Sequence, residues 1–100
     1  MTPPHPAIAM IEKQLKQLDA IYAEAENTLN TALGTDRVRA WKAQTEPLLA
    51  KAAGLEEAKA FAARKPGPSF TQDLLEELSD EVELYRSHLA ALVAKLQKNG

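Results

Sequence analysis

Cysteine is absent from this 100-residue sequence, and several other residue types are too few or too scattered to form the sites they usually make. Without thiols the chain has no disulfides, zinc–thiolate sites or cysteine nucleophiles. The four glycines stand singly, so there is no glycine-rich loop to cradle a phosphate. No apolar run approaches the roughly 18 residues that indicate a membrane-spanning helix. These absences direct attention to helix packing and contacts with other chains.

The first six residues include three prolines and lack the basic segment and apolar run of a signal peptide. We therefore expect residues 1–6 to form a flexible proline-rich arm and residues 7–100 to form one domain. Pro6 could instead occupy the first turn of a helix, where its missing N–H does no harm. A cytoplasmic protein without membrane association is the expectation, and export by a signal-independent route stays open.

Charge is nearly balanced, with a formal net charge of −2 at pH 7. A dedicated DNA-binding domain would carry a basic footprint, so the composition argues against one. Residues 35–54 hold four bases and two acids, whereas residues 69–100 hold six acids and three bases. The middle of the chain is thus mildly basic, and its C-terminal third is acidic.

Hydrophobic residues make up 45% of the chain, but 18 of them are alanine. Few large apolar side chains remain to build a core. This composition suits narrow packing of helix on helix, and it suits a protomer that a second copy completes. The high content of Ala, Leu, Glu and Lys favours helix throughout.

Residues 69–98 contain neither proline nor glycine and carry a seam, a line of apolar residues at alternating spacings of three and four. This spacing is typical of one helix packed against others. We predict a helix over 69–98, with Ser69 as its N-cap and Gln72 as the capping-box partner. The seam residues are Leu75, Leu78, Val82, Tyr85, Leu89, Leu92 and Leu96.

A second seam of the same period predicts a first helix over residues 7–33, ended by Gly34 in the left-handed conformation. Ile21 and Leu33 widen its apolar stripe. The two long helices have similar lengths, so we expect them to pack together. The seam residues are Ile8, Ile11, Leu15, Leu18, Tyr22, Ala25, Leu29 and Ala32.

Two further helices are predicted between the long ones. Thr35 should cap a helix over 36–53, in which Pro47 should cause a kink or a break near residues 43–46. After Gly54, a short helix should cover 55–64 with Leu55 and Phe61 inward. The fold class is therefore all-α: a three- to four-helix bundle whose long first and last helices pack together, with a kinked helix and a short helix between them.

The basic middle segment combines Arg37, Arg39 and Lys42 with Trp41, a pattern that can bind single-stranded nucleic acid by stacking a base on the ring. Trp41 also continues the apolar stripe of its helix, which favours a place in the core or in an interface. The three cations then form a solvated face, and we expect them to pair with the acids of the last helix.

Groups that could carry chemistry have ordinary structural interpretations. The six acids between Asp73 and Glu83 fall mostly on outward positions and compensate the helix dipole. A di-iron site would need a Glu three residues before a histidine, and neither His5 nor His88 has one. We expect His88 to be a partly exposed structural residue and His5 to have no partner. No cofactor, metal or catalytic residue is predicted.

The leading functional hypothesis is a non-enzymatic interaction module that self-associates, as a homodimer or larger, through its long-helix surface. Leu84 lies off the seam and fits a second contact surface. The alternative is an adaptor, chaperone-like or antitoxin-like regulator that holds a partner's helix in a groove lined by Trp41, Leu48 and Phe61. A third possibility is weak binding of single-stranded nucleic acid by the basic middle helix.

Overall fold

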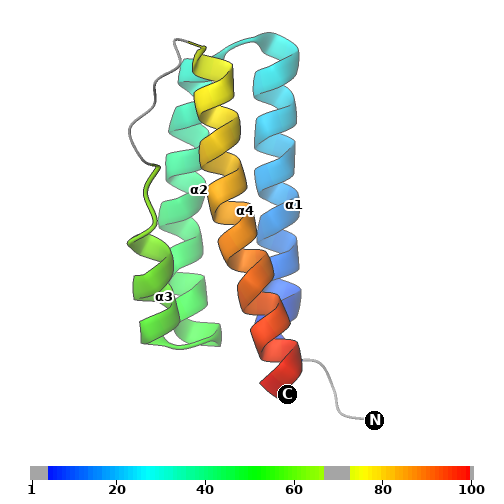
Figure 1. The fold of residues 1–100 in the computed structure, drawn as a ribbon, viewed down its shortest axis with the longest axis vertical. Helices are drawn as coiled ribbons and strands as arrows, with labels where there is room; N and C mark the ends of the chain where they lie inside the picture. Colours follow the sequence, from blue (N-terminus) through cyan, green and yellow to red (C-terminus); the bar gives the residue numbers. More distant parts are fainter. Residues whose placement is uncertain (1–4, 67–72, 100) are drawn as a thin grey trace.

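The computed structural model describes residues 5–66 and 73–99, which form a bundle of helices. The prediction of an all-α bundle is confirmed. α1 and α2 are antiparallel neighbours, and α4 runs parallel to α2 and antiparallel to α1 (Figure 1). The short α3 packs beside the C-terminal part of α2 (Figure 1). The four helices are α1 (Pro6–Thr28), α2 (Thr31–Ala52), α3 (Leu55–Ala62) and α4 (Leu74–Asn99).

α1 begins at Pro6, so the alternative in which Pro6 occupies the first turn of the helix is the correct one. A proline at this position loses no helical hydrogen bond. His5 is its N-cap, and the Nδ1 of His5 accepts a hydrogen bond from the N–H of Ala7 at 3.0 Å. The expectation that His5 has no partner is therefore wrong.

The turn between α1 and α2 comes five residues earlier than predicted. Leu29, with φ 57° and ψ 20°, takes the left-handed conformation that was assigned to Gly34. The side chain of Asn30 caps α2 by accepting from the N–H of Leu33 at 3.1 Å, so Thr35 is not the cap. Asparagine is a more favourable N-cap than threonine or glycine, because the oxygen of its short side-chain amide accepts hydrogen bonds from nearby backbone N–H groups.

Gly34 lies inside α2 and is buried, because the helices approach closely there. A Cβ atom added at this position would lie 2.8 Å from the Cβ of Ala25 in α1 and 2.9 Å from the Cδ2 of Leu78 in α4. We call this contact of Ala25, Gly34 and Leu78 the glycine crossing. The glycine is selected here by space and not by backbone conformation.

α2 continues through Pro47 without the predicted break. The proline leaves the carbonyl of Ala43 without its N–H partner. Both residues are exposed, so the lost hydrogen bond lies on the face turned to water.

The remaining boundaries agree in part with prediction. Gly54 precedes α3 with φ 110°, and α3 ends at Ala62, two residues before the predicted end. α4 begins at Leu74, later than predicted, and Ser69 and Gln72 lie outside the described residues. Asp73 caps α4, and its Oδ1 accepts from the N–H groups of Leu75 and Glu76 at 3.0 and 3.2 Å.

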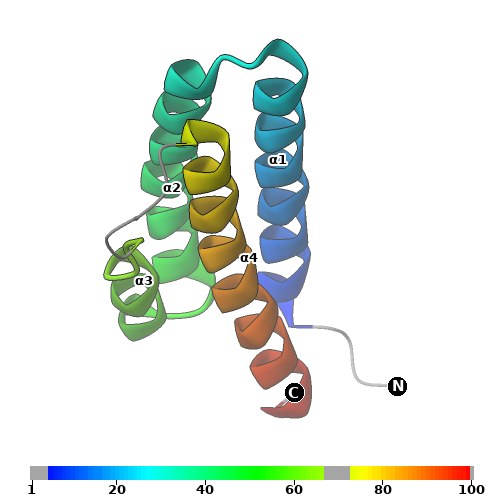
Figure 2. The ribbon, with the colours of Figure 1, turned by 45° about the horizontal axis from the view of Figure 1, so that its top comes forward.

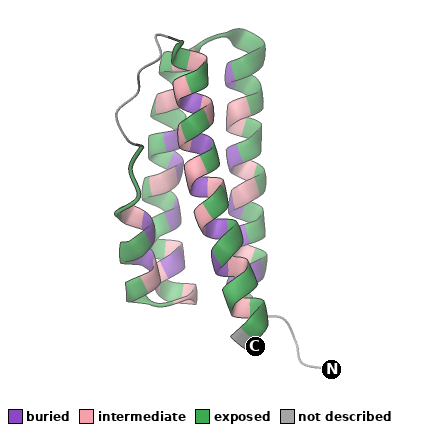
Figure 3. Cartoon of the chain, in the orientation of Figure 1, coloured by how far each residue is buried: buried purple, intermediate pink, exposed green. Residues whose placement is uncertain are grey.

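The apolar stripes of α1, α2 and α4 face one another and form one core (Figure 3). The predicted seam of the last helix is buried from Leu78 to Leu92, and Leu75 and Leu96 are half-buried. Four residues expected to face inward do not: Leu29 is 73%, Leu33 41% and Leu55 61% exposed, and Ala32 is exposed as well. Leu33 lies beyond the point where α1 ends, so no helix covers it from that side.

Candidate functional site

Four rings meet where α2, α3 and α4 come together, and we call this the aromatic junction: Trp41, Phe61, Tyr85 and His88. Phe61 lies at its centre, with ring centroids 5.8 Å from Trp41, 5.8 Å from Tyr85 and 5.9 Å from His88. The Trp41–Phe61 and Phe61–Tyr85 pairs are edge-to-face, the arrangement that aromatic quadrupoles favour. Phe61 is the residue by which the eight-residue α3 is anchored to the bundle.

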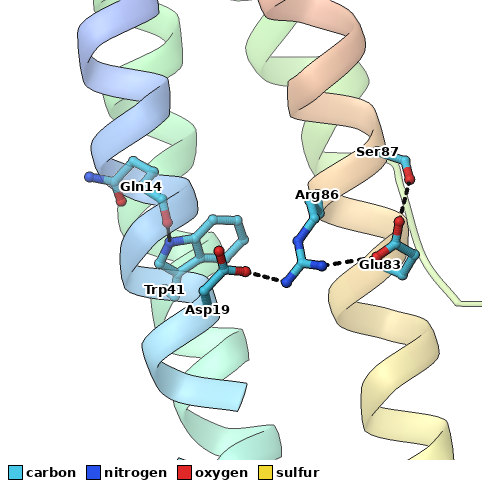
Figure 4. Close-up of polar contacts among 6 residues, drawn as sticks. All are labelled: Gln14, Asp19, Trp41, Glu83, Arg86 and Ser87. Carbon is cyan, nitrogen blue, oxygen red and sulfur yellow. Dashed lines mark hydrogen bonds and ion pairs between the residues drawn. The ribbon is translucent and has the colours of Figure 1, made fainter. Parts of the chain in front are cut away.

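Trp41 is a core residue, with only 3% of its surface exposed. Its indole Nε1 donates to the backbone carbonyl of Gln14 in α1 at 2.8 Å (Figure 4). The carbonyl also belongs to the helix ladder, so the ring is held without disturbing α1. Trp41 and Phe61 are thus covered by the chain's own helices, and Leu48 is half-buried. In the free protein the groove expected at these three residues is filled by α3.

A buried polar pair, Gln14 and Thr45, lies beside Trp41. The Oγ1 of Thr45 lies 2.7 Å from the carbonyl oxygen of Trp41 and 3.0 Å from the side-chain oxygen of Gln14. A hydroxyl has one proton, so both contacts are satisfied when the Gln14 amide is turned to donate through its nitrogen. Gln14 was overlooked in the sequence, although it lies three residues after Ile11 and four before Leu18, in the apolar stripe.

Lys42 links all three helices of the aromatic junction. Its Nζ donates to the carbonyl of Arg64 after α3 and to the hydroxyl of Tyr85 at 3.4 Å, and lies 4.7 Å from the Tyr85 ring centroid. The Tyr85 hydroxyl donates to Glu81 at 2.9 Å. Burial lowers the pKa of Lys42, against the opposing effect of Glu81, and burial with the Glu81 hydrogen bond raises the pKa of Tyr85. The raised pKa keeps the Tyr85 hydroxyl protonated at neutral pH, in agreement with its role as donor to Glu81.

The other two basic candidates have different surroundings. Arg37 forms an ion pair with Glu24 of α1, not with the acids of the last helix as expected. Arg39 has no hydrogen bond or ion pair within residues 5–66 and 73–99. Only Lys42 faces an acid of α4, namely Glu81. The basic segment is thus divided among different neighbours and does not form one strip beside an exposed aromatic ring.

An open depression of about 520 Å³ lies next to this network, between α2, α4 and the end of α3. A cavity of this size is within the range of small-molecule sites. Charged residues surround it and alanines face it from two helices. Its lining is Arg39, Lys42, Ala43, Glu46, Ala62, Lys65, Pro66, Glu81 and Tyr85.

His88 holds the end of α3 to α4. Its Nδ1 accepts from the Nε of Arg64 at 3.1 Å, which places the proton of the neutral ring on Nε2. Nε2 is buried and has no hydrogen-bond partner in the described part of the chain. Burial lowers the pKa of His88, Arg64 lowers it further, and Glu57 opposes the shift. The geometry agrees with a structural histidine.

Ion pairs on the surface join the helices outside the core. Arg86 of α4 contacts Asp19 of α1 and, at 3.2 Å, Glu83 of its own helix (Figure 4). Lys95 of α4 contacts Glu57 of α3 at 2.9 Å. These pairs are exposed, so each contributes little to stability.

The end of α1 and the starts of α2 and α4 lie at the same end of the bundle (Figure 2). Three leucines of these segments are exposed. Leu29 is 73%, Leu74 61% and Leu33 41% exposed. Leu74 lies one turn before Leu78 on the same side of α4, so it extends the core past its last layer, the glycine crossing. We call Leu29, Leu33 and Leu74 the apolar end. Sequence reasoning missed it, because all three positions were assigned to helix interiors.

The remaining candidate, Leu84, is half-buried and packs against the core. Among the described residues, no three acidic or histidine side chains gather as metal ligands would. None of the described helices combines the length and apolar character needed to cross a membrane. Comparison of the chain with protein-family models, curated proteins and solved structures found no match.

Proposed function

We propose that this chain is a non-enzymatic interaction module whose apolar end binds a basic, apolar segment of another protein. The observation that carries the proposal is that three exposed leucines belong to the segments that meet at one end of the bundle, where α1 ends and α2 and α4 begin. Single exposed apolar residues are ordinary on soluble proteins, but a contiguous group rimmed by charge is typical of a contact surface.

The backbone of Leu29 strengthens this interpretation. A non-glycine residue in the left-handed region costs roughly 1–2 kcal/mol, and glycine or asparagine usually occupies it. Here a leucine takes this conformation while its side chain lies largely in water. Neither backbone preference nor burial within the chain accounts for leucine at this position. Burial against a partner does.

The charge around the apolar end indicates the chemistry of the partner. Residues 22–37 and 73–80 contain seven acids and one base, Arg37, which pairs with Glu24. Acids near the start of α2 and α4 compensate the helix dipoles, but Glu24 and Glu26 lie at the C-terminal end of α1, where acids are unfavourable. This excess of negative charge favours a basic partner through electrostatic steering and complementarity. The seven acids are Glu24, Glu26, Asp36, Asp73, Glu76, Glu77 and Asp80.

Self-association is the competing hypothesis, and two observations weigh against it. The seams that motivated it are largely buried between helices of one chain, as at Ile11, Leu18 and Leu89. Two apolar ends brought face to face would also oppose two acidic rims, and like charges at an interface are costly. A partner with the opposite charge avoids both objections.

The test uses a synthetic amphipathic helix with leucines on one face and lysines on the other, titrated by calorimetry. We expect Leu74→Ser to weaken binding about tenfold, as the loss of one buried leucine allows. Leu55→Ser is the matched control, because Leu55 is also 61% exposed but lies at the start of α3. Binding should weaken as the ionic strength rises from about 0.05 to 0.5 M.

Three results would overturn the proposal. One is equal weakening by Leu55→Ser and Leu74→Ser. Another is equal binding of a peptide in which the lysines are replaced by glutamates. The third is a concentration-dependent dimer in light scattering that Leu74→Ser abolishes, which would assign the apolar end to a second copy.

A further inference from the structure

The depression at the end of α3 exists because α3 is short. α2 and α4 have 22 and 26 residues, but α3 has only eight and ends at Ala62. Beyond this point the space between α2 and α4 is lined by Ala43 of α2 and by Ala62 and Pro66, while the buried Tyr85 lines it from α4. Small side chains leave the volume of about 520 Å³ unfilled.

Three cations line this depression, and two of them have no hydrogen-bond or ion-pair partner among residues 5–66 and 73–99. Neither Arg39 nor Lys65 forms a hydrogen bond or ion pair within the described part of the chain. Lys42 uses one N–H for the carbonyl of Arg64 and a second for the hydroxyl of Tyr85. An ammonium has three donors, so one remains.

The lining also holds two carboxylates, of which Glu81 is engaged by a hydrogen bond. Glu81 accepts the hydroxyl of Tyr85, and both Glu81 and Glu46 act on Lys42 by raising its pKa. Lys65 acts in the opposite direction and, after the dominant effect of burial, lowers the pKa of Lys42. Like charges therefore face each other across the depression, and an anion placed among them would relieve their repulsion.

We propose that the depression bounded by Arg39, Lys42 and Lys65 binds a small organic anion. The anionic group lies among the three cations, and an apolar body of the ligand lies against Ala43, Ala62 and Pro66. Arginine suits this role, because its planar fork can donate two parallel hydrogen bonds to a carboxylate or a phosphate. The site is separate from the apolar end, and it does not depend on the function proposed above.

The test compares benzoate with benzamide, which share an apolar body and differ in charge, and adds inorganic phosphate as an anion without that body. Binding is followed by amide NMR shifts of the ¹⁵N-labelled full chain. We expect saturable benzoate binding with a Kd on the order of 1–10 mM, which a ligand of so few atoms reaches at an ordinary binding efficiency per atom. The shifts should centre on Lys42, Ala43 and Lys65. Benzamide and phosphate should bind more weakly.

Charge-removing variants then assign the site. Arg39→Gln and Lys65→Gln should each weaken benzoate binding about fivefold or more, since each removes one charged contact. Lys59→Gln is the matched control, because Lys59 is an exposed lysine of α3 outside the depression. Equal weakening by Lys59→Gln would show general attraction to positive charge and overturn the proposal. So would benzamide binding as well as benzoate, or shifts that do not saturate. Tighter binding of phosphate than of benzoate would refute the apolar part of the site.

Discussion

The glycine crossing and the aromatic junction both hold α2 to α4, but they do so by opposite means. At the glycine crossing, α1, α2 and α4 approach until a single Cβ would not fit. At the aromatic junction, rings fill the wider space between α2, α3 and α4. Close approach and large side chains both produce dense packing, but the first fails when volume is added and the second when volume is removed.

The two regions also differ in polar content. The atoms nearest to the position that a Cβ of Gly34 would occupy are apolar. A substitution there should therefore act through side-chain volume and not through charge. The aromatic junction includes His88 and lies against Lys42, and burial lowers the pKa of both side chains. The aromatic junction should therefore respond to pH, whereas the glycine crossing should not.

Removing volume from the aromatic junction should have the largest effect. Phe61→Ala should lower the free energy of unfolding by about 3–5 kcal/mol, because it leaves a cavity among three rings. This is a large share of the roughly 5–15 kcal/mol that stabilises a typical domain. α3 would lose its anchor, since an isolated helix of eight residues is unstable in water. Urea unfolding followed by circular dichroism measures the change.

Leu55→Ala provides the comparison within α3, because Leu55 is exposed where Phe61 is fully buried. We expect it to change the free energy of unfolding by no more than about 0.5 kcal/mol. Similar losses for the two variants would mean that α3 is not held by Phe61.

Adding volume to the glycine crossing should have the next largest effect. Gly34→Ala brings a Cβ within 3 Å of Ala25 and Leu78. The Leu78 methyl group can move, but the Cβ of Ala25 is fixed to the α1 backbone. Overpacking should cost about 1–3 kcal/mol, against a gain of about 1 kcal/mol in helix propensity. We expect net destabilisation, measured as a lower midpoint of urea unfolding.

Ala40→Gly measures how helix propensity alone changes the free energy of unfolding, because Ala40 is exposed in the same helix. It should cost about 1 kcal/mol. If Gly34→Ala stabilises the protein by the amount that Ala40→Gly destabilises it, the helices have no close contact at Gly34.

The contrast explains what sequence could and could not predict. Seam spacing identified the helices and most of the buried face of α4, because burial of an apolar stripe follows directly from helical periodicity. Gly34 was misread because glycine has two uses, left-handed backbone and close packing, and only the position of α4 decides between them. The helix-ending signal at Leu29–Asn30 was weak in comparison, since leucine rarely takes a positive φ.

The candidate sites were harder to predict, since they depend on contacts between distant segments. Trp41 was correctly favoured for a buried position by its stripe, but its hydrogen bond to Gln14 spans 27 residues. The pairing of Arg37 with Glu24 required knowledge of where α1 ends. The depression depends on the length of α3, which was predicted to end two residues beyond its actual end at Ala62.

Protonation of His88 at low pH should give the smallest effect, and of the two regions it should act on the aromatic junction alone. The pKa of His88 lies below its ordinary value of 6.5 in the folded chain, chiefly because of burial. The unfolded chain therefore binds more protons between that lowered pKa and about 6.5. The His88 contribution to stability is full above this window and is lost as the pH falls through it. Protonation also removes the acceptor of Arg64 and places two cations side by side.

The matched variant is His88→Phe, which keeps a ring beside Phe61 and cannot titrate. We expect the free energy of unfolding of the native chain to decline more steeply than that of the variant as the pH falls below about 6.5. Carboxylates that titrate at lower pH are common to both proteins, so the difference between the two profiles isolates His88. If the two profiles are parallel, protonation of His88 does not lower the free energy of unfolding, and the prediction is wrong. The Gly34→Ala variant should keep the native pH profile, because its defect is one of shape.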